Sequence, residues 1–302
     1  QLAGFTSSQV PAFSTTQLAA MTTGQAAALT TTQLRALTSS QVAGLTTAQV
    51  AALTTSQLGG LASTQVAGLT TAQIANMTTR QISGLCTAQV PGLTTGQIGA
   101  LSTAQVAAFE TADLAAFSTT QLRGLTSAQA AALTTAQLSN LTTTQVAGLA
   151  STQLGGLTSA QGAALTTGQV AALSSTQVGT LSTDAVKGLT TAGIVALDST
   201  QIKGLTTAQI AILSTAQVAA IETADLAAMT TTQLPGFTTA GVAAMTTAQV
   251  ANLGTAQIRA LTSSQVPAMT TAQLSNMGTA QIAGFGSTQV GALTSGQVAA
   301  LT

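Results

Sequence analysis

Two pairs of carboxylates are the most chemically suggestive residues of the sequence. Glu110 and Asp113 stand three residues apart, and so do Glu222 and Asp225. On a helix this spacing places both acids on one face, so each pair could give oxygen ligands to a weak Ca²⁺ site. Two carboxylates fall well short of the roughly six to eight oxygens that Ca²⁺ takes. We therefore favour a simpler interpretation, in which each pair lies at a helix N-terminus that stabilises negative charge.

Three other places could carry chemistry. Cys86 is the only cysteine, so it has no disulfide partner within the sequence. It is a candidate reactive thiol, although a tolerated substitution for Ser explains it as well. Asp184 and Asp198 flank a stretch that also holds Lys187. This stretch is either a local docking site or a region where the repeat described below has drifted.

Composition excludes most other chemistry. The sequence has no His, no Trp and no Tyr, and its six cations and six acids give zero net charge. Without His and with isolated carboxylates there is no nucleophile–base pair, so we predict no enzyme activity, no small-molecule substrate, no cofactor and no metal site. Scattered cations do not provide the basic patch that nucleic-acid binding needs.

A repeat of eight residues must position all of these side chains. Gln recurs at every eighth residue from Gln1 to Gln297, filling 33 of 38 such places and occurring nowhere else. We number each octad from the consensus T-T-A-Q-V-A-A-L, so that Thr46 is at position one and Leu53 at position eight. Position eight is a large apolar residue in every octad, and position two is always Ser or Thr. The five octads without the Gln have another residue at position four: Asp113, Ala185, Gly193, Asp225 and Gly241.

One short helix per octad explains this pattern best. Position one is a preferred N-cap, and Gln three residues later completes an S/T-x-x-Q capping box. The preceding position eight and position five are the partners of a hydrophobic staple. Positions five and eight, such as Val146 and Leu149, are predicted to be buried, whereas positions three and six face solvent. Arg123, Lys187 and Arg259, all at position six, are therefore predicted to be exposed.

The sequence leaves a β-solenoid open as the alternative, with two or three octads per coil. All four prolines stand at position six, where they would interrupt a helix. Pro91-Gly92 and Pro235-Gly236 resemble the centres of type II turns. A stacked Thr ladder would also explain the strict position two. In the helical interpretation, Gly or Asn at position seven would end the helix in a left-handed conformation.

The organisation is expected to be one continuous array over residues 1–302. Its ends look like interior octads and not like polar caps, so we expect it to be a fragment of a longer array. Thr and Gln interrupt every apolar run, so no membrane span is predicted. A nearly uncharged surface and uncapped ends favour self-association into a filament or sheath.

Tandem L-[ST]-T-x-Q-[VIL]-x-[AG] octads resemble the repeat tracts of very large bacterial secreted or surface proteins. Such proteins are often labelled adhesin-like, haemagglutinin-like or haem-utilisation exoproteins. The resemblance covers the whole sequence and implies an extracellular or cell-surface location with a structural or adhesive role. It transfers no catalytic or binding residue, and the haem label finds no His ligand here.

Two functions from different classes follow from these observations. The first is a structural repeat protein that forms an extracellular fibre, stalk or surface layer. The second is a binding module whose Thr-rich face binds ice or another surface. The Ser and Thr residues are also possible sites of O-glycosylation.

Overall fold

A computed structural model describes residues 4–301 and shows one short helix in each of the 37 octads that it covers. Of these helices 32 are α-helical and five are 3₁₀, and residues 4–301 contain no strand. The prediction of an all-α solenoid is confirmed, and the β-solenoid alternative is wrong. The chain divides into two compact units, Gln1–Gln153 and Leu154–Thr302, which are described separately.

The two units have the same construction. The helices of the first unit are η2 (Val10–Ala12), α1 (Thr15–Ala19), α2 (Thr23–Ala27), α3 (Thr31–Ala36), α4 (Ser39–Ala43), α5 (Thr47–Ala51), α6 (Thr55–Gly59), α7 (Ser63–Gly68), α8 (Thr71–Ala75), α9 (Thr79–Ser83), η3 (Val90–Gly92), α10 (Thr95–Gly99), α11 (Thr103–Ala107), α12 (Thr111–Ala115), α13 (Thr119–Leu122), α14 (Ser127–Ala132), α15 (Thr135–Asn140) and α16 (Thr143–Ala147). Next in the chain is α17 (Ser151–Leu154). The helices of the second unit are α18 (Ser159–Ala164), α19 (Thr167–Ala171), α20 (Ser175–Thr180), α21 (Thr183–Gly188), α22 (Thr191–Val195), η4 (Ile202–Gly204), α23 (Thr207–Ala211), α24 (Thr215–Ala220), α25 (Thr223–Ala228), η5 (Leu234–Gly236), α26 (Thr239–Ala244), α27 (Thr247–Ala251), α28 (Thr255–Ala260), η6 (Val266–Ala268), α29 (Thr271–Ser275), α30 (Thr279–Ile282), α31 (Ser287–Gly291) and α32 (Ser295–Ala299).

Most α-helices begin with the predicted capping box. Before α5, the Thr46 Oγ1 accepts a hydrogen bond from the Gln49 N–H at 3.1 Å, and the Thr46 N–H donates to Gln49 Oε1 at 2.7 Å. The α-helices begin at position two and end at position five, six or seven. Positions eight and one are then extended, as at Leu37 (ψ 144°) and Thr38 (ψ 160°). Two extended residues thus separate one helix from the next.

Position seven does not end the helix as the sequence suggested. Among residues 4–301 no residue, glycine or other, has a positive φ. Gly44 and Asn76 stay near the right-handed helical region, with φ of −76° and −90°. The predicted left-handed termination is therefore wrong. Asn76 serves the helix end through its side chain, since its Nδ2 donates to the Ala72 carbonyl at 2.8 Å.

The four proline octads form 3₁₀ helices, not type II turns. In ordinary octads the N–H of position six can bond to the carbonyl of position two, as Arg123 does to Thr119 at 3.0 Å. Proline has no N–H, so the α-helix cannot form and a three-residue 3₁₀ helix follows over positions five to seven. Pro91 and Pro235 are the second residues of η3 and η5. The predicted type II turns at Pro91-Gly92 and Pro235-Gly236 are wrong, because a type II turn needs a positive φ at the glycine.

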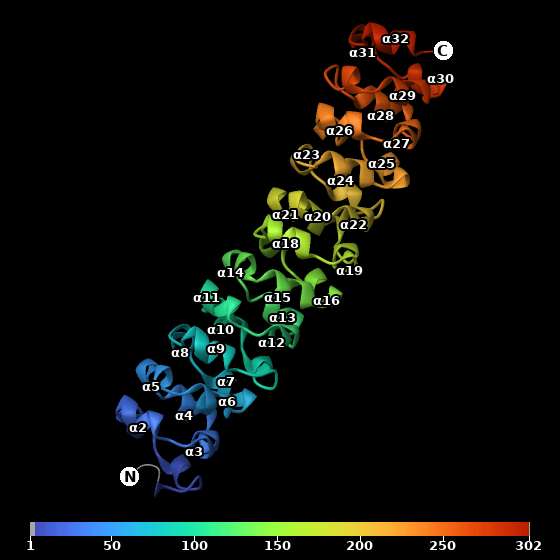
Figure 1. The fold of residues 1–302 in the computed structure, drawn as a ribbon. Helices are drawn as coiled ribbons and strands as arrows, with labels where there is room; N and C mark the ends of the chain where they lie inside the picture. Colours follow the sequence, from blue (N-terminus) through green and yellow to red (C-terminus); the bar gives the residue numbers. More distant parts are fainter. Residues whose placement is uncertain (1–3, 302) are drawn as a thin grey trace. The chain divides into compact units, whose positions relative to one another are not determined.

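Helices three octads apart stack on one another. In the first unit α2, α5 and α8 follow one another along the same side (Figure 1), and α2 contacts α5 as α5 contacts α8. In the second unit α18 contacts α21 in the same way. An isolated helix needs about 12–15 residues to be even marginally stable. Helices of five or six residues are much shorter, so they depend on this stacking for their stability.

The core consists of positions five and eight, which we call the apolar seam. The seam residues expected to be buried expose no more than 4 % of their surface: Leu141, Val146, Leu149 and Leu157. The cations expected on the surface are exposed: Arg123, Lys187 and Arg259. The predicted division of the octad into buried and solvent-facing positions is confirmed.

Position seven packs closely against position two of the octad that lies three octads earlier in the sequence. A Cβ placed on Gly44 would lie 2.8 Å from the Thr15 Cβ, and one on Gly92 would collide with the Ser63 carbonyl oxygen. In the same contact region the Ser39 hydroxyl donates to the Thr64 carbonyl at 2.9 Å. Small residues at position seven therefore allow neighbouring turns to approach, and position two is the surface that they meet.

Candidate functional site

The repeating Gln at position four is the chemical centre of each octad. Gln97 is only 1 % exposed. Its Oε1 accepts from the Thr94 N–H at 2.7 Å, which is the capping-box bond. Its Nε2 donates to the carbonyls of Val66 at 2.8 Å and Leu69 at 2.6 Å, which are 31 and 28 residues earlier. One side chain thus caps its own helix and bonds to the preceding turn of the solenoid.

The same pattern recurs along both units. In the first unit the Nε2 of Gln65 donates to the carbonyls of Leu34 and Leu37, at 2.8 and 2.7 Å. In the second unit Gln249 donates to the carbonyls of Val218 and Ile221, at 3.1 and 2.6 Å. In these examples the acceptors are positions five and eight of the octad four earlier, whereas Gln41 and Gln57 bond to positions six and eight of that octad. Helices stack three octads apart, and amides bond to carbonyls four octads back. One turn of the solenoid therefore contains between three and four octads.

Sequence reasoning identified the accepting half of this site and missed the donating half. A capping box accepts Glu as well as Gln at its third helical residue. Yet Gln occupies 33 of the 38 places and Glu none of them. Only the amide can donate to a second group while its oxygen accepts in the box. Because Glu cannot donate, its absence from position four indicated that a buried hydrogen-bond acceptor lies opposite this position.

The octads that lack the Gln differ in how they compensate. At Ala185 the missing amide is replaced by Ser182, whose hydroxyl donates to the Leu157 carbonyl, 28 residues before position four. Thr190 and Thr238 still cap their helices by accepting from the N–H groups of Gly193 and Gly241, both at 3.0 Å. These octads keep the cap, and the Ser182 octad also keeps a bond to the earlier turn.

Asp113 and Asp225 bury a carboxyl where the amide would be. They expose 3 % and 7 % of their surface. Burial raises the pKa of Asp113 above its ordinary value, and the nearby charge of Glu110 raises it further. The pKa of Asp225 is raised for the same reasons, by burial first and then by Glu222 and Asp198. The charge of each Glu thus acts on the Asp three residues later.

The geometry of these pairs fits a helix N-terminus. Glu110 and Glu222 are the N-cap residues of α12 and α25, although neither side chain makes a cap hydrogen bond, and the Asp lies in the first turn. Within residues 4–301 no three or more His, Cys, Asp or Glu side chains gather as metal ligands would. Among the described residues, the Ca²⁺ site considered from the sequence therefore has no acidic ligand cluster beyond the two carboxylates of each pair.

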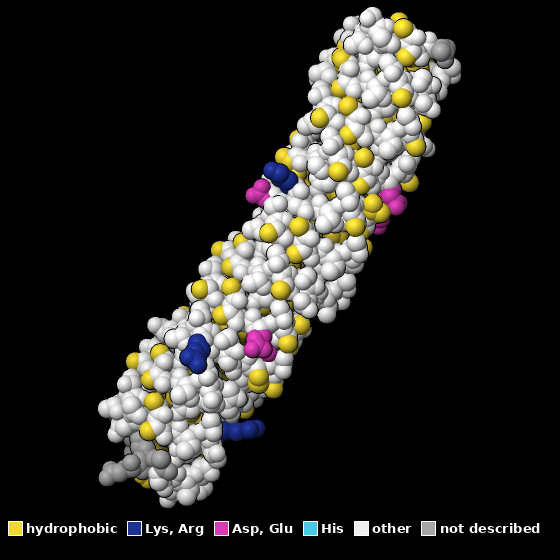
Figure 2. Space-filling model, viewed as in Figure 1, with side chains coloured by type: hydrophobic (Ala, Val, Ile, Leu, Met, Phe, Trp, Pro, Cys, Tyr) yellow, Lys and Arg dark blue, Asp and Glu magenta, His cyan; other side chains and the backbone are white. Residues whose placement is uncertain are grey.

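The other candidate residues are exposed. Cys86 is exposed at position one before η3, and its N–H donates to Gln89 Oε1 at 3.0 Å. Asp198 acts as a cap, because its Oδ1 accepts from the N–H groups of Thr200 and Gln201, both at 2.8 Å. Asp184 and Lys187 are exposed on α21. On the face drawn in Figure 2 charged side chains are few and scattered among neutral ones.

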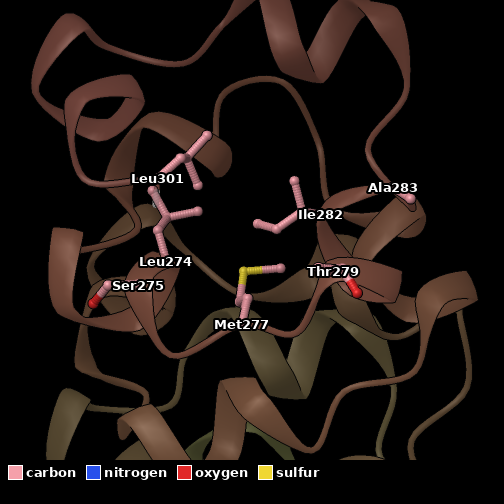
Figure 3. A pocket seen from close by; sticks show the side chains of 7 residues that line it. All are labelled: Leu274, Ser275, Met277, Thr279, Ile282, Ala283 and Leu301. Atoms are coloured by element: carbon pink, nitrogen blue, oxygen red, sulfur yellow. The ribbon is translucent and has the colours of Figure 1, made fainter.

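An apolar hollow lies near the C-terminal end of the second unit. Figure 3 shows the side chains of Leu274, Met277, Ile282 and Leu301 directed toward a common space. Residues at the seam positions line it, so it is a place where the apolar seam is left uncovered. Its lining carries no charged side chain.

Comparison with protein families decides what kind of repeat this is. The model of the ALTTAQ repeat matches most of the chain, in nine stretches: residues 1–31, 23–55, 79–109, 106–143, 163–199, 186–220, 218–255, 250–279 and 271–302. The chain belongs to the ALTTAQ repeat family. A comparison with curated proteins found no match. Between residues 4 and 301 this ALTTAQ repeat protein has no helix that is both long and apolar enough to cross a membrane.

Proposed function

We propose that this ALTTAQ repeat protein is a non-catalytic structural element of an extracellular fibre, stalk or surface layer. The observation that supports the proposal is the constant bonding of position four. The Gln97 side chain uses its oxygen within its own octad and its nitrogen on the turn before. Since each added octad repeats these bonds, length increases without any change in local structure, as a spacer or fibre requires.

The surface supports the same role. Position three is exposed in both units, positions one and six are exposed or half-buried, and all three positions are mostly Thr, Ser, Ala and Gly. Only twelve charged residues are spread over the chain. Such a surface repels copies of itself weakly, which favours association into larger assemblies. The resemblance to bacterial surface proteins supports an extracellular location.

Immunogold electron microscopy of the native cells tests this role. Antibodies raised against the folded 302-residue chain should label filaments, stalks or a layer outside the cell membrane. Pre-immune serum is the control. Label confined to the cell interior would contradict the proposal.

The alternative of an ice-binding Thr face has less structural support. Thr hydroxyls at position one accept the capping hydrogen bond, as Thr94 does from the Gln97 N–H at 3.2 Å. Position-two residues such as Thr15 pack against position seven of a later octad. Neither row is a free, flat array for binding water. A thermal-hysteresis assay should therefore show no activity, and clear hysteresis would favour the alternative.

A further inference from the structure

Val195 is a large apolar side chain on the outer surface of the second unit. It is 45 % exposed and stands at position six, where the other octads have Ala, Gly, Ser, Pro, Lys or Arg. The apolar seam does not need it, because Ile194 and Leu197 are the buried residues of the same octad. Val195 lines a shallow groove with Ala196, which follows it, and with Ala220 of α24, the helix that contacts α22.

Two acids stand beside this groove. Asp198 follows Ala196 by two residues, and Glu222 follows Ala220 by two residues. Two residues of chain span at most about 7 Å, so each acid lies close to the groove. Both acids are exposed. Burial and then the charges of both acids raise the pKa of Asp225, which places the two acids in one neighbourhood.

The nearest cations in the sequence face other sides of the solenoid. Lys187 and Lys203 stand at position six of the octads before and after Val195. Each octad turns the chain by between a quarter and a third of a turn, so neither lysine shares the side of Val195. The lining of the groove carries no charged side chain. This surface is therefore apolar with an acidic border.

The first unit has a hollow of complementary shape at α6. Gly59 and Gly60 occupy positions six and seven of that octad, so no side chain fills the place that Val195 fills on α22. A Cβ on Gly59 would approach no atom more closely than the Gly84 carbonyl oxygen, at 3.4 Å. With Thr31 of α3, the two glycines line a second shallow groove. This hollow has room for a side chain from outside.

Two arginines flank the hollow. Arg35, on α3, lines the same groove, and Arg80, on α9, lines a neighbouring groove together with Thr55 of α6. Within residues 4–301 neither guanidinium makes a hydrogen bond or an ion pair, whereas the Arg123 Nε donates to the Gly148 carbonyl at 2.7 Å. The helices α3, α6 and α9 carry no acid. The two cations are therefore free for an external anionic group.

We propose that the surface around Val195 of one copy docks on the surface around Gly59 of a second copy. The acidic face comprises Val195, Asp198 and Glu222, and the basic face comprises Arg35, Gly59 and Arg80. Val195 enters the hollow at Gly59, which removes apolar surface from water. Around it, two acids of one copy approach two arginines of the other, and such complementarity selects the partner and the register.

The layers of the two faces match in either direction. Since α6 contacts α3 on one side and α9 on the other, one arginine stands a layer away from the hollow on each side. Glu222 directly follows α24, so it stands one layer from Val195. With Val195 in the hollow, Glu222 is level with Arg80 if the two copies are parallel and with Arg35 if they are antiparallel.

The two faces differ, so the contact is heterologous and side by side. Each added copy leaves one acidic face and one basic face free, which predicts continued lateral association. The inference rests on the proposed structural role and names the partner and the surface. Its test by association in solution is independent of where the protein is located, so either proposal can fail alone.

Charge reversal with sedimentation velocity tests the contact. The 302-residue wild-type chain should associate as its concentration rises. Arg35→Glu with Arg80→Glu should weaken association at least about tenfold, and so should Asp198→Lys with Glu222→Lys. All four substitutions in one chain reverse both faces, so association should return to within about threefold of the wild type. Asp198→Lys also removes a helix cap, and this rescue separates the lost charge from the lost cap.

Filling the hollow tests the shape without changing any charge. Gly59→Val should weaken association at least about tenfold, with unchanged circular dichroism, since position six already accommodates Val195. Ala75→Val, at an exposed position six on α8 that lines neither groove, is the matched control and should associate like the wild type.

Three results would overturn the proposal. The first is a wild-type chain that stays monomeric at every concentration. The second is a fourfold variant that associates as weakly as the two charge variants. The third is a Gly59→Val chain that associates as well as the wild type, because the contact would then lie elsewhere on the surface.

Discussion

At the scale of single residues, the Gln side chain carries two functions that are usually separate. Its oxygen caps a helix, and its nitrogen bonds to carbonyls of the preceding turn, as Gln97 shows. A Glu would serve the first function and oppose the second, because a carboxylate only accepts and would be buried against carbonyl oxygens. This explains why Gln fills 33 of the 38 places at position four and Glu fills none.

Replacing one buried amide by a carboxylate should therefore cost more than losing a cap. For Gln97→Glu we expect the free energy of unfolding to fall by about 2–4 kcal/mol, because two carbonyls lose their donor and a charge is buried. Thr94→Ala, the matched control, removes only the cap and should cost about 1 kcal/mol. Urea denaturation measures both. Equal losses for the two variants would show that the bonds between turns contribute nothing.

The buried Asp residues should make stability depend on pH. The pKa of Asp113 and of Asp225 is raised from the ordinary value of 3.8. The folded chain therefore holds these protons to higher pH than the unfolded chain, so the free energy of unfolding falls as pH rises from about 4 through the raised pKa values. Asp113→Gln with Asp225→Gln should remove this fall and restore the amide donors.

The gain from this double substitution should be largest at neutral pH, at roughly 1–2 kcal/mol for each site. It should shrink at acid pH, where the wild-type carboxyls are neutral. Urea unfolding of the wild type and the double variant at pH 4 and pH 7 gives the comparison. A gain that is the same at both pH values would show that the two carboxyls are not titrating in this range.

At the scale of the element, each helix is fixed by neighbours and not by its own length. The apolar seam supplies most of its packing, and position seven decides how closely the next turn can approach. Proline shortens the helix to a 3₁₀ turn without displacing the seam, since Val90 remains buried in η3. The octad therefore tolerates a change of helix type as long as positions five and eight keep their places.

Removing one seam residue tests how much this packing contributes. Leu149 is 3 % exposed. For Leu149→Ala we expect a loss of about 2–5 kcal/mol in the free energy of unfolding, because a cavity remains where the side chain was. Thr144→Ala, at an exposed position three of the same octad, should change stability little. Thermal or urea unfolding of both variants is sufficient, and a loss within error for Leu149→Ala would mean that the seam is not a true core.

Glycine at position seven should be sensitive to a single added methyl group. In Gly92→Ala the new Cβ collides with the backbone carbonyl of Ser63, so the turns must separate and about 1–3 kcal/mol should be lost. Gly96 is at position three of α10, where the nearest atom to a Cβ is 3.9 Å away. Gly96→Ala should stabilise by about 0.5–1 kcal/mol. If both variants gain stability, the turns are not in close contact at Gly92.

At the scale of the whole molecule, stability should appear only when turns can stack. A Gln needs carbonyls 28 and 31 residues earlier, so a piece of four octads holds none of these bonds between turns. Within a unit, each further octad adds one interface, which is the behaviour of a quasi-one-dimensional array.

A series of fragments cut from the first unit tests this dependence on length. The piece 94–125, with four octads, should show little helix by circular dichroism, because its helices are too short to be stable alone. Pieces that extend to eight and twelve octads should gain helix per residue and melt at rising temperatures. The control is the four-octad piece in trifluoroethanol, which reveals whether the helices can form locally. Full helicity of that piece in plain buffer would contradict the stacking argument.

The sequence by itself determined the octad. The cap at Thr46, the box with Gln49 and the burial of Val50 and Leu53 all lie within eight residues, and local physical chemistry is sufficient to predict them. The five exceptions at position four and the isolated carboxylates were equally visible. The sequence wrongly predicted a left-handed helix end at position seven, where the backbone of Gly44 and Asn76 is right-handed.

Only the tertiary structure decided which octads meet. Helices stack three octads apart and amides reach four octads back because positions eight and one are extended and set the rotation between successive helices. That rotation, between a quarter and a third of a turn, recurs at every octad, and no pattern within eight residues specifies it. For the same reason the acceptors of the Gln97 amide and the neighbour of Gly92 could be found only once the turns were placed on one another.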